Sequence, residues 1–146
     1  MNGLISKPVK SLKGSAVAPG DKSISHRSLM FGALGDSETK VTGILEGEDV
    51  ICTAGALTAM GVSIEKPATA GGTWKIKGAG TLKTPANNIY LGNSGTSARL
   101  LMGLAGGYPL QAVFTGDDSL SKRPMGRVTK PLSAMGINFE SVGDKL

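Results

Sequence analysis

The chain contains an internal repeat, and this duplication constrains the fold more than any other feature of the sequence. Residues 57–65 (LTAMGVSIE) recur as residues 132–140 (LSAMGINFE), with an identical or similar residue at every position. A second match precedes the first one in the same order. It aligns Gly20, Ser25, Arg27, Leu29 and Met30 with Gly92, Ser97, Arg99, Leu101 and Met102. Two matches in one order indicate a duplicated supersecondary unit rather than chance.

Within each copy, the hydrophobic pattern predicts helices that alternate with short strands. The expected helices are residues 23–34, 48–60, 95–105 and 124–135, and the expected strands are residues 39–43, 62–66, 73–77, 110–114 and 137–140. Pro124 suits a first helical turn, because its missing N–H has no partner to lose there. Gly61 and Gly136 follow the second helix of each copy, where a left-handed cap residue is common. The repeating unit is therefore α/β and βαβαββ-like, and the second copy stops at Leu146, where its last strand should begin.

Composition narrows the class of protein. Only 4% of the residues are aromatic, so the core is expected to rest on Leu, Ile, Val, Met and Ala. The single cysteine, Cys52, excludes a disulfide framework and a multi-cysteine metal site, and we expect it to be a small buried residue within a helix. The N-terminus has no apolar leader, and no stretch approaches the roughly 18 apolar residues of a membrane span. The sequence therefore predicts a soluble, cytoplasmic protein with no membrane partner.

The net charge of +5 fits either a solvated basic surface or an anion-binding cleft. Position favours the cleft, because many basic residues lie in or beside Gly/Ser-rich segments. They are Lys22, Arg27, Arg99, Lys122, Arg123 and Arg127. We expect no nucleic-acid partner, because Trp74, Tyr90 and Tyr108 are scattered and do not interleave with basic residues.

The first candidate site is residues 19–27 (PGDKSISHR). Ser23 suits a helix N-terminus, where unpaired backbone N–H groups and the helix dipole favour anions. Lys22 adds a charge at the same end, and Arg27 lies four residues after Ser23 on the same helical face. An ordinary capped helix with exposed basic residues explains this composition about equally well. The lone histidine, His26, fits a partly buried structural residue better than a catalyst.

The second candidate site is residues 91–99 (LGNSGTSAR), in which small residues again precede a helix. A side chain at Gly95 would project into whatever the helix end binds. The alternative is a packing glycine in a crowded turn.

The third candidate site is residues 116–127 (GDDSLSKRPMGR). Lys122 and Arg123 directly precede the expected helix, so their charges oppose its dipole, and an anionic ligand would explain them. The alternative is a screened loop charge.

These three segments resemble the N-terminal signatures of the EPSP synthase family. PGDKSISHR, LGNSGTSARLL and DSLSKRPMGRV occur in the family's order and at similar spacing, and the resemblance covers essentially the whole chain. It implies the enolpyruvyl transferase fold, an inside-out α/β barrel with two domains of three βαβαββ units each. It also implies that residues 1–19 are a strand segment of a C-terminal domain. The sequence itself favours one strand at residues 14–18, before the Pro19-Gly20 turn. Residues 20–146 would then be part of an N-terminal domain, with units at about 20–80 and 81–146.

The resemblance also implies roles for individual residues. Lys22 would lie between both substrates as the catalytic residue of this chain, and Ser23 and Arg27 would contact shikimate 3-phosphate. The remaining implied roles are phosphoenolpyruvate binding for Arg123, a position bordering that site for Gly95, and a supporting role for Arg99. The family's acid/base residues, an Asp, a Lys and a Glu, come from a later part of a full-length chain. Asp49, Asp117 and Asp118 do not match those positions.

The implied reaction transfers enolpyruvyl from phosphoenolpyruvate to the 5-hydroxyl of shikimate 3-phosphate and releases phosphate, with no metal or organic cofactor. Activity would require a complementary C-terminal fragment of the same enzyme. Glyphosate, the inhibitor, would occupy the phosphoenolpyruvate site. Gly95 by itself predicts sensitivity to it, whereas the KRPMGRV form and Leu100 resemble the tolerant bacterial class.

Two rival interpretations remain at this point. A relative that transfers enolpyruvyl to UDP-N-acetylglucosamine would carry Lys-Asn in place of Lys22-Ser23. It would also carry a cysteine in the loop before Arg123-Pro124, and this chain has neither feature. The other rival is a free-standing anion-binding module without catalysis.

Overall fold

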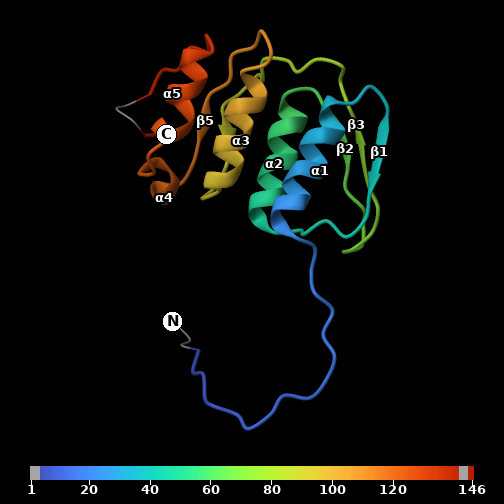
Figure 1. The fold of residues 1–146 in the computed structure, drawn as a ribbon. Helices are drawn as coiled ribbons and strands as arrows, with labels where there is room; N and C mark the ends of the chain where they lie inside the picture. Colours follow the sequence, from blue (N-terminus) through green and yellow to red (C-terminus); the bar gives the residue numbers. More distant parts are fainter. Residues whose placement is uncertain (1–3, 142–144) are drawn as a thin grey trace.

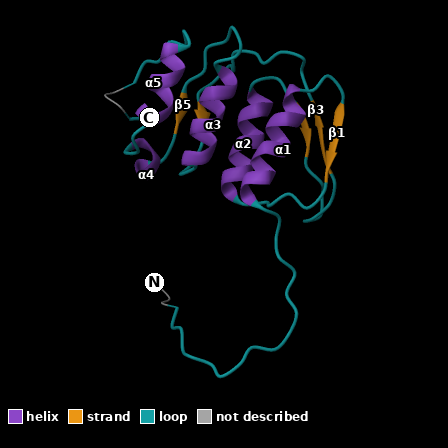
Figure 2. Ribbon diagram, in the orientation of Figure 1, coloured by secondary structure: helices purple, strands orange, loops and turns teal. Residues whose placement is uncertain are grey.

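The computed structural model describes residues 4–141 and 145–146. Three long helices lie side by side, with a three-stranded sheet next to α1 and α2 and a two-stranded sheet beyond α3 (Figures 1 and 2). The helices are α1 (Lys22–Leu34), α2 (Glu48–Ala59), α3 (Gly95–Ala105), α4 (Asp118–Ser121) and α5 (Gly126–Ala134). The strands are β1 (Glu38–Val41), β2 (Ser63–Glu65), β3 (Trp74–Lys77), β4 (Ile89–Tyr90) and β5 (Phe114–Thr115).

The first repeat unit forms an antiparallel sheet in the order β1-β3-β2. β3 is the central strand, and it pairs Ile76 with Thr39 of β1 and with Ile64 of β2. Because side chains alternate along a strand, Trp74 and Ile76 are buried while Lys75 and Lys77 are exposed. One face of the sheet therefore supports α1 and α2, and the strand expected at residues 73–77 is confirmed.

The second unit begins with β4, which pairs in parallel with β5. α3 connects these two strands, as a parallel crossover requires. The short helix α4 and then α5 follow β5 (Figure 1).

The repeated segments have the same backbone geometry at their helix ends. Gly61 and Gly136 have φ values of +98° and +96°, so both occupy the left-handed region that was expected of them. After each glycine, the next N–H reaches back to a carbonyl of the last turn, which is the Schellman motif. The two bonds run from Val62 N to Leu57 O (3.0 Å) and from Ile137 N to Leu132 O (3.2 Å). The duplication is thus visible in the structure at the level of single hydrogen bonds.

Several boundaries differ from the sequence-based expectations in the second unit. Residues 110–113 and 137–140 form no strand, and β5 begins only at Phe114. Strand 89–90 and helix α4 were not expected. α5 begins at Gly126 and not at Pro124, because the intervening residues close α4 and form a bridge between Pro124 and Lys145.

The N-terminal segment differs as well. Residues 4–20 contain no helix or strand and extend away from the helices (Figure 1), so the strand expected at residues 14–18 is absent from this structure.

The core is aliphatic, as the composition indicated, apart from Trp74, which is its largest buried side chain. Leu29 and Leu101, which are equivalent in the two repeats, are both fully buried. Cys52 lies in α2 and is half-buried. None of the helices in the described part of the chain is both long and apolar enough to span a lipid bilayer.

Candidate anion-binding site

The N-terminal ends of α1, α2 and α3 lie together at one end of the molecule (Figure 1). Lys22, at the start of α1, forms an ion pair with Asp49 in the first turn of α2. Ser97, in the first turn of α3, donates a hydrogen bond to the backbone carbonyl of Asp49 at 3.0 Å. Three helix dipoles thus direct their positive ends to the same region, which favours anions there.

The helix ends are already capped by groups of the chain itself. Asp21, and not a serine, is the N-cap of α1, and its carboxylate accepts from the Ile24 N–H at 2.7 Å. Ser94 caps α3 by accepting from the Ser97 N–H at 3.2 Å. The recognition of a ligand at this end therefore depends on side chains in addition to unpaired backbone N–H groups.

A groove of about 270 Å³ runs between α1 and α3. Its lining residues are Ser23 and Arg27 of α1 and Thr96, Arg99 and Leu100 of α3. Arg27 and Arg99 are equivalent positions of the repeat, so the duplication places one guanidinium group on each wall. The structure thus brings together residues of the first and second candidate segments.

Arg123 of the third candidate segment reaches the same region from the end of α4. A Cβ atom built on Gly95 would lie 2.7 Å from Nη1 of Arg99 and 2.8 Å from Nη1 of Arg123. Arg99 is held by the carbonyls of Gly95 (3.0 Å) and Pro124 (2.9 Å), and Arg123 contacts the Ser119 hydroxyl at 3.4 Å. Two guanidinium groups therefore converge beside Gly95, where any side chain would push against them.

These guanidinium groups have no acidic counterpart among the described residues. Among residues 4–141 and 145–146, no carboxylate lies within ion-pair distance of Arg27, Arg99 or Arg123. Like charges that converge without a carboxylate repel one another, and a bound carboxylate or phosphate would relieve this repulsion with bidentate hydrogen bonds.

Neither Lys122 nor Arg123 directly precedes a helix, contrary to the expectation, because α5 begins only at Gly126. Lys122 is the C-cap of α4, whose own N-terminus carries Asp117 as its cap and Asp118 in its first turn. The cation therefore follows the C-terminal end of a helix, where the dipole favours it. Lys122 does not line the groove, and its position gives no argument for a ligand.

Beneath the groove, a chain of buried hydroxyl groups links the three helices. The His26 Nδ1 atom lies 2.8 Å from the Thr53 hydroxyl, which lies 2.8 Å from the Ser97 hydroxyl, and Ser97 lies 2.6 Å from the Ser94 hydroxyl. None of these four side chains is more than 1% exposed. Burial lowers the pKa of His26, which favours its neutral form. The histidine is structural, as its sequence context indicated.

The sequence reasoning missed Thr53 and the pairing of Asp49 with Lys22. Thr53 and Asp49 both lie on α2, which carries none of the three Gly/Ser-rich segments. The available signal was the spacing of four residues between Asp49 and Thr53, which places both on the face of α2 that meets α1 and α3.

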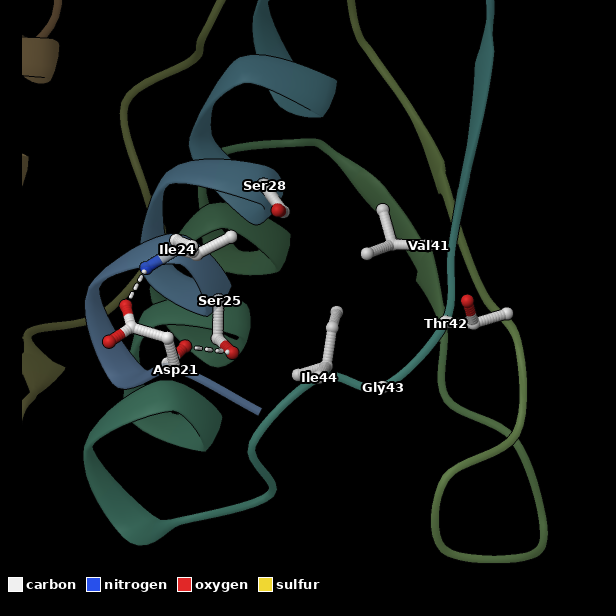
Figure 3. A pocket seen from close by; sticks show the side chains of 8 residues that line it. All are labelled: Asp21, Ile24, Ser25, Ser28, Val41, Thr42, Gly43 and Ile44. Atoms are coloured by element: carbon white, nitrogen blue, oxygen red, sulfur yellow. Dashed lines mark hydrogen bonds between the residues drawn. The ribbon is translucent and has the colours of Figure 1, made fainter. Parts of the chain in front are cut away.

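A second hollow, of about 40 Å³, lies between α1 and the loop after β1 (Figure 3). Its walls mix polar and apolar side chains, and Ser25 donates to the Asp21 carbonyl at 2.7 Å within it. The residues around it include no cation; they are Asp21, Ile24, Ser25, Ser28, Val41, Thr42, Gly43 and Ile44. This hollow therefore has neither the charge nor the volume for an anionic metabolite.

The groove supplies hydroxyl and guanidinium donors, and no carboxylate lines it. The part of the chain described by the structure also holds no cluster of three or more His, Cys, Asp or Glu side chains that could bind a metal ion. The arrangement can bind and orient anions and stabilise developing negative charge.

Comparisons with known proteins agree on one family. The family model described as EPSP synthase (3-phosphoshikimate 1-carboxyvinyltransferase) matches residues 6–145. The 3-phosphoshikimate 1-carboxyvinyltransferase of Novosphingobium aromaticivorans is 58% identical over 130 residues, which cover 88% of this chain. The protein of the same name from Desulforamulus reducens is 53% identical over 138 residues, which cover 93% of this chain.

The similarity extends to solved structures. An EPSP synthase from Acinetobacter baumannii matches with a TM-score of 0.83 and 52% identity, over 90% of this chain and 30% of that one. This match confirms the expected α/β fold of the enolpyruvyl transferases. The chain spans 29% and 32% of the lengths of the two curated relatives. With a family model that matches nearly all of its residues, the chain belongs to the EPSP synthase family.

Proposed function

We propose that this chain forms the anion-binding part of a 3-phosphoshikimate 1-carboxyvinyltransferase. The enzyme would transfer the enolpyruvyl group of phosphoenolpyruvate to the 5-hydroxyl of shikimate 3-phosphate and release phosphate. The observation that carries this proposal is the groove between α1 and α3, which Arg27 and Arg99 line, with Arg123 next to Arg99 beside Gly95 and no carboxylate among the described residues that line it. Two substrates that each carry phosphate and carboxylate groups match this excess of positive charge.

The two walls of the groove suggest how the substrates divide. Ser23 and Arg27 on α1 would bind shikimate 3-phosphate, and Arg123 beside Gly95 would bind phosphoenolpyruvate. Arg99 is tied to the carbonyls of Gly95 and Pro124, which suits a supporting role. Lys22, at the start of α1, would contact both substrates once they compete with Asp49 for its ammonium group.

In this reaction, the 5-hydroxyl oxygen loses its proton and forms a bond to C2 of phosphoenolpyruvate while the methylene carbon takes up a proton. The tetrahedral intermediate then loses phosphate together with a proton from the methyl group, which restores the double bond. The residues of this chain would orient the two anions and balance their charge. The groups that move protons would come from outside the groove described here, because no carboxylate lines it.

We also propose that a complementary C-terminal polypeptide completes the enzyme. The matched relatives are about three times as long as this chain. Residues 4–19 extend away from the helices, which suits a segment that packs on another domain (Figure 1). Glyphosate, an anion of similar charge, would compete for the phosphoenolpyruvate side of the groove. Because charged phosphate esters cross membranes poorly, we propose that the enzyme works where they are made, in the cytoplasm.

Calorimetric titration of the 146-residue chain with each substrate tests the division of the groove. A charge-assisted contact contributes about 1.5–3 kcal/mol, so its loss should weaken binding by about ten- to a hundredfold. Arg27→Ala should act mainly on shikimate 3-phosphate and Arg123→Ala mainly on phosphoenolpyruvate. Arg127→Ala removes an equal charge outside the groove and is the matched control.

The assignment fails if Arg27→Ala and Arg123→Ala each leave both affinities within about twofold of the parent chain. Mixing with the complementary polypeptide then tests catalysis. Turnover of the two substrates by the mixture supports the transferase, whereas substrate binding without any turnover favours a non-catalytic anion-binding module.

A further inference from the structure

The buried hydroxyl chain beneath the groove has a hub, the Thr53 side chain. Its hydroxyl is within hydrogen-bond distance of His26 on α1 (2.8 Å) and of Ser97 on α3 (2.8 Å). In this chain of contacts, only Thr53 touches both flanking helices. Thr53 lies one turn after Asp49, the residue whose carboxylate holds Lys22.

The two sides of the buried hydroxyl chain lie close in sequence to residues at the groove. His26 directly precedes Arg27, and Ser97 lies two residues before Arg99. Ser94, which caps α3, directly precedes Gly95. A shift of α1 or α3 relative to α2 would therefore change the separation of the guanidinium groups on the two walls.

From His26 through Thr53 and Ser97 to the Asp49 carbonyl, the donors and acceptors fit a single direction, whereas Ser94 donates to Ser97 from the other side. Ser97 donates to the Asp49 carbonyl at 3.0 Å, so its oxygen is available to accept from Thr53. Thr53 has one proton, which it can donate to Ser97 at 2.8 Å or to the Asp49 carbonyl at 3.3 Å. In both cases Thr53 accepts from His26, which requires the proton of the neutral imidazole to be on Nδ1. The other ring nitrogen, Nε2, is buried and has no hydrogen-bond partner among the described residues. An unpaired acceptor is less costly there than an unpaired N–H donor would be. Hydrogen bonds that point in one direction also strengthen one another.

We infer that Thr53 is a positioning residue that sets the distance between the two walls of the anion-binding groove. Its hydroxyl holds α1 through the Nδ1–H tautomer of His26 and holds α3 through Ser97. The consequence for substrate binding rests on the function proposed above, whereas the effect on His26 and on the helix positions does not.

Thr53→Val tests this inference, because valine keeps the shape of the side chain and removes the hydroxyl. We expect ¹⁵N NMR of the 146-residue chain to show that His26 loses its single Nδ1–H tautomer. We also expect nuclear Overhauser contacts between α1 and α3 to change. Binding of shikimate 3-phosphate and of phosphoenolpyruvate should weaken together, each by about tenfold or more, because both walls move. Thr53→Ser keeps the hydroxyl and should restore all three properties.

Thr58→Val, on the exposed side of the same helix, is the matched control and should change none of them. A Thr53→Val protein that folds, keeps the His26 tautomer and binds both ligands within about twofold of the parent would overturn the inference. If the valine variant does not fold, Ser97→Ala provides the test. It removes the link from Thr53 to α3, together with the bonds of the Ser97 hydroxyl to the Asp49 carbonyl and to Ser94, and it leaves the contact between Thr53 and His26 in place. It should therefore weaken both ligands while the His26 signal stays unchanged. Parental binding by that variant would also overturn the inference.

The two proposals can fail separately. A parent chain that bound neither ligand would refute the proposed function, and the His26 tautomer and the contacts between α1 and α3 would still decide the role of Thr53. A parent chain that bound both ligands, together with an unaffected Thr53→Val variant, would refute only the positioning role.

Discussion

At the scale of single residues, Gly95 determines how closely two positive charges approach. Its Cα hydrogen occupies the place where a Cβ atom would meet both the Arg99 and the Arg123 guanidinium groups. Those groups are the far ends of long side chains, so they can move at little cost to the fold. A side chain at this position should therefore affect ligand binding much more than stability.

Gly95→Ala makes this expectation measurable. The free energy of unfolding should stay within about 0.5–1 kcal/mol of the parent or rise, because alanine is favoured over glycine in a helix. Affinity for phosphoenolpyruvate should fall, and affinity for glyphosate, which is the longer ligand, should fall more. Urea unfolding and calorimetric titration of the variant measure the two effects.

Gly103→Ala is the matched control for this substitution. Gly103 lies on the same helix, and a Cβ atom built on it meets nothing within 4 Å. It should leave both affinities unchanged. Equal losses of affinity for glyphosate and phosphoenolpyruvate in Gly95→Ala would show that the added methyl group does not discriminate between them.

At the scale of elements, the glycines that end α2 and α5 show what the repeat conserves. Both adopt a left-handed conformation, and both are followed by a hydrogen bond that closes the helix. A residue with a Cβ atom is strained by about 1–2 kcal/mol in this conformation. The repeated Met-Gly pair is therefore a structural signal rather than a functional one.

Gly61→Ala should lower the free energy of unfolding by about 1–2 kcal/mol, as measured by urea denaturation. Gly55→Ala, inside the same helix, should act in the opposite direction and raise it by about 0.5–1 kcal/mol. Gly55 has open space around it and lies within a regular helix. If both substitutions destabilised the protein equally, the cause would be the helix surface and not the left-handed cap.

These elements also show how far the sequence could predict the fold. α3 begins and ends at the expected residues because its signals are local, with a Ser94 cap, an apolar face and following glycines. The strands of the second unit were misplaced because a strand depends on its partner. Residues 137–140 repeat the sequence of β2, yet the described residues supply no third strand that pairs with them as β3 pairs with β2.

The candidate site, like the fold, was predictable from the sequence only in part. The three Gly/Ser-rich segments were visible in the sequence, and the structure brings Arg27, Arg99 and Arg123 into one region. The link between Thr53 and Ser97 joins residues far apart in the chain, and neither lies in a motif that predicts the other. Contacts of this kind follow from helix packing and not from local pattern.

At the scale of the whole molecule, one buried histidine connects the packing of three helices to solution pH. His26 is fully buried, and burial lowers its pKa below the ordinary value of 6.5. Asp49 acts in the opposite direction by raising the pKa of His26, and Lys22 lowers it further. When the chain unfolds, the imidazole regains water and its ordinary pKa, so the unfolded state binds a proton that the folded state does not.

The sign of the effect follows from this difference in bound protons. Stability rises with pH wherever the unfolded state binds more protons, so the contribution of His26 is complete above about pH 6.5 and is lost as the pH falls below it. The slope from one such group reaches at most about 1.4 kcal/mol per pH unit.

His26→Asn removes the titration and keeps an amide group that can donate to Thr53 near the position of Nδ1. Urea unfolding of both proteins between about pH 5 and 7.5 should show that the parent chain loses more stability toward acid than the variant does. The carboxylates titrate in both proteins and cancel in the difference. Parallel stability curves over this range would mean that His26 takes up a proton as readily in the folded chain as in the unfolded one.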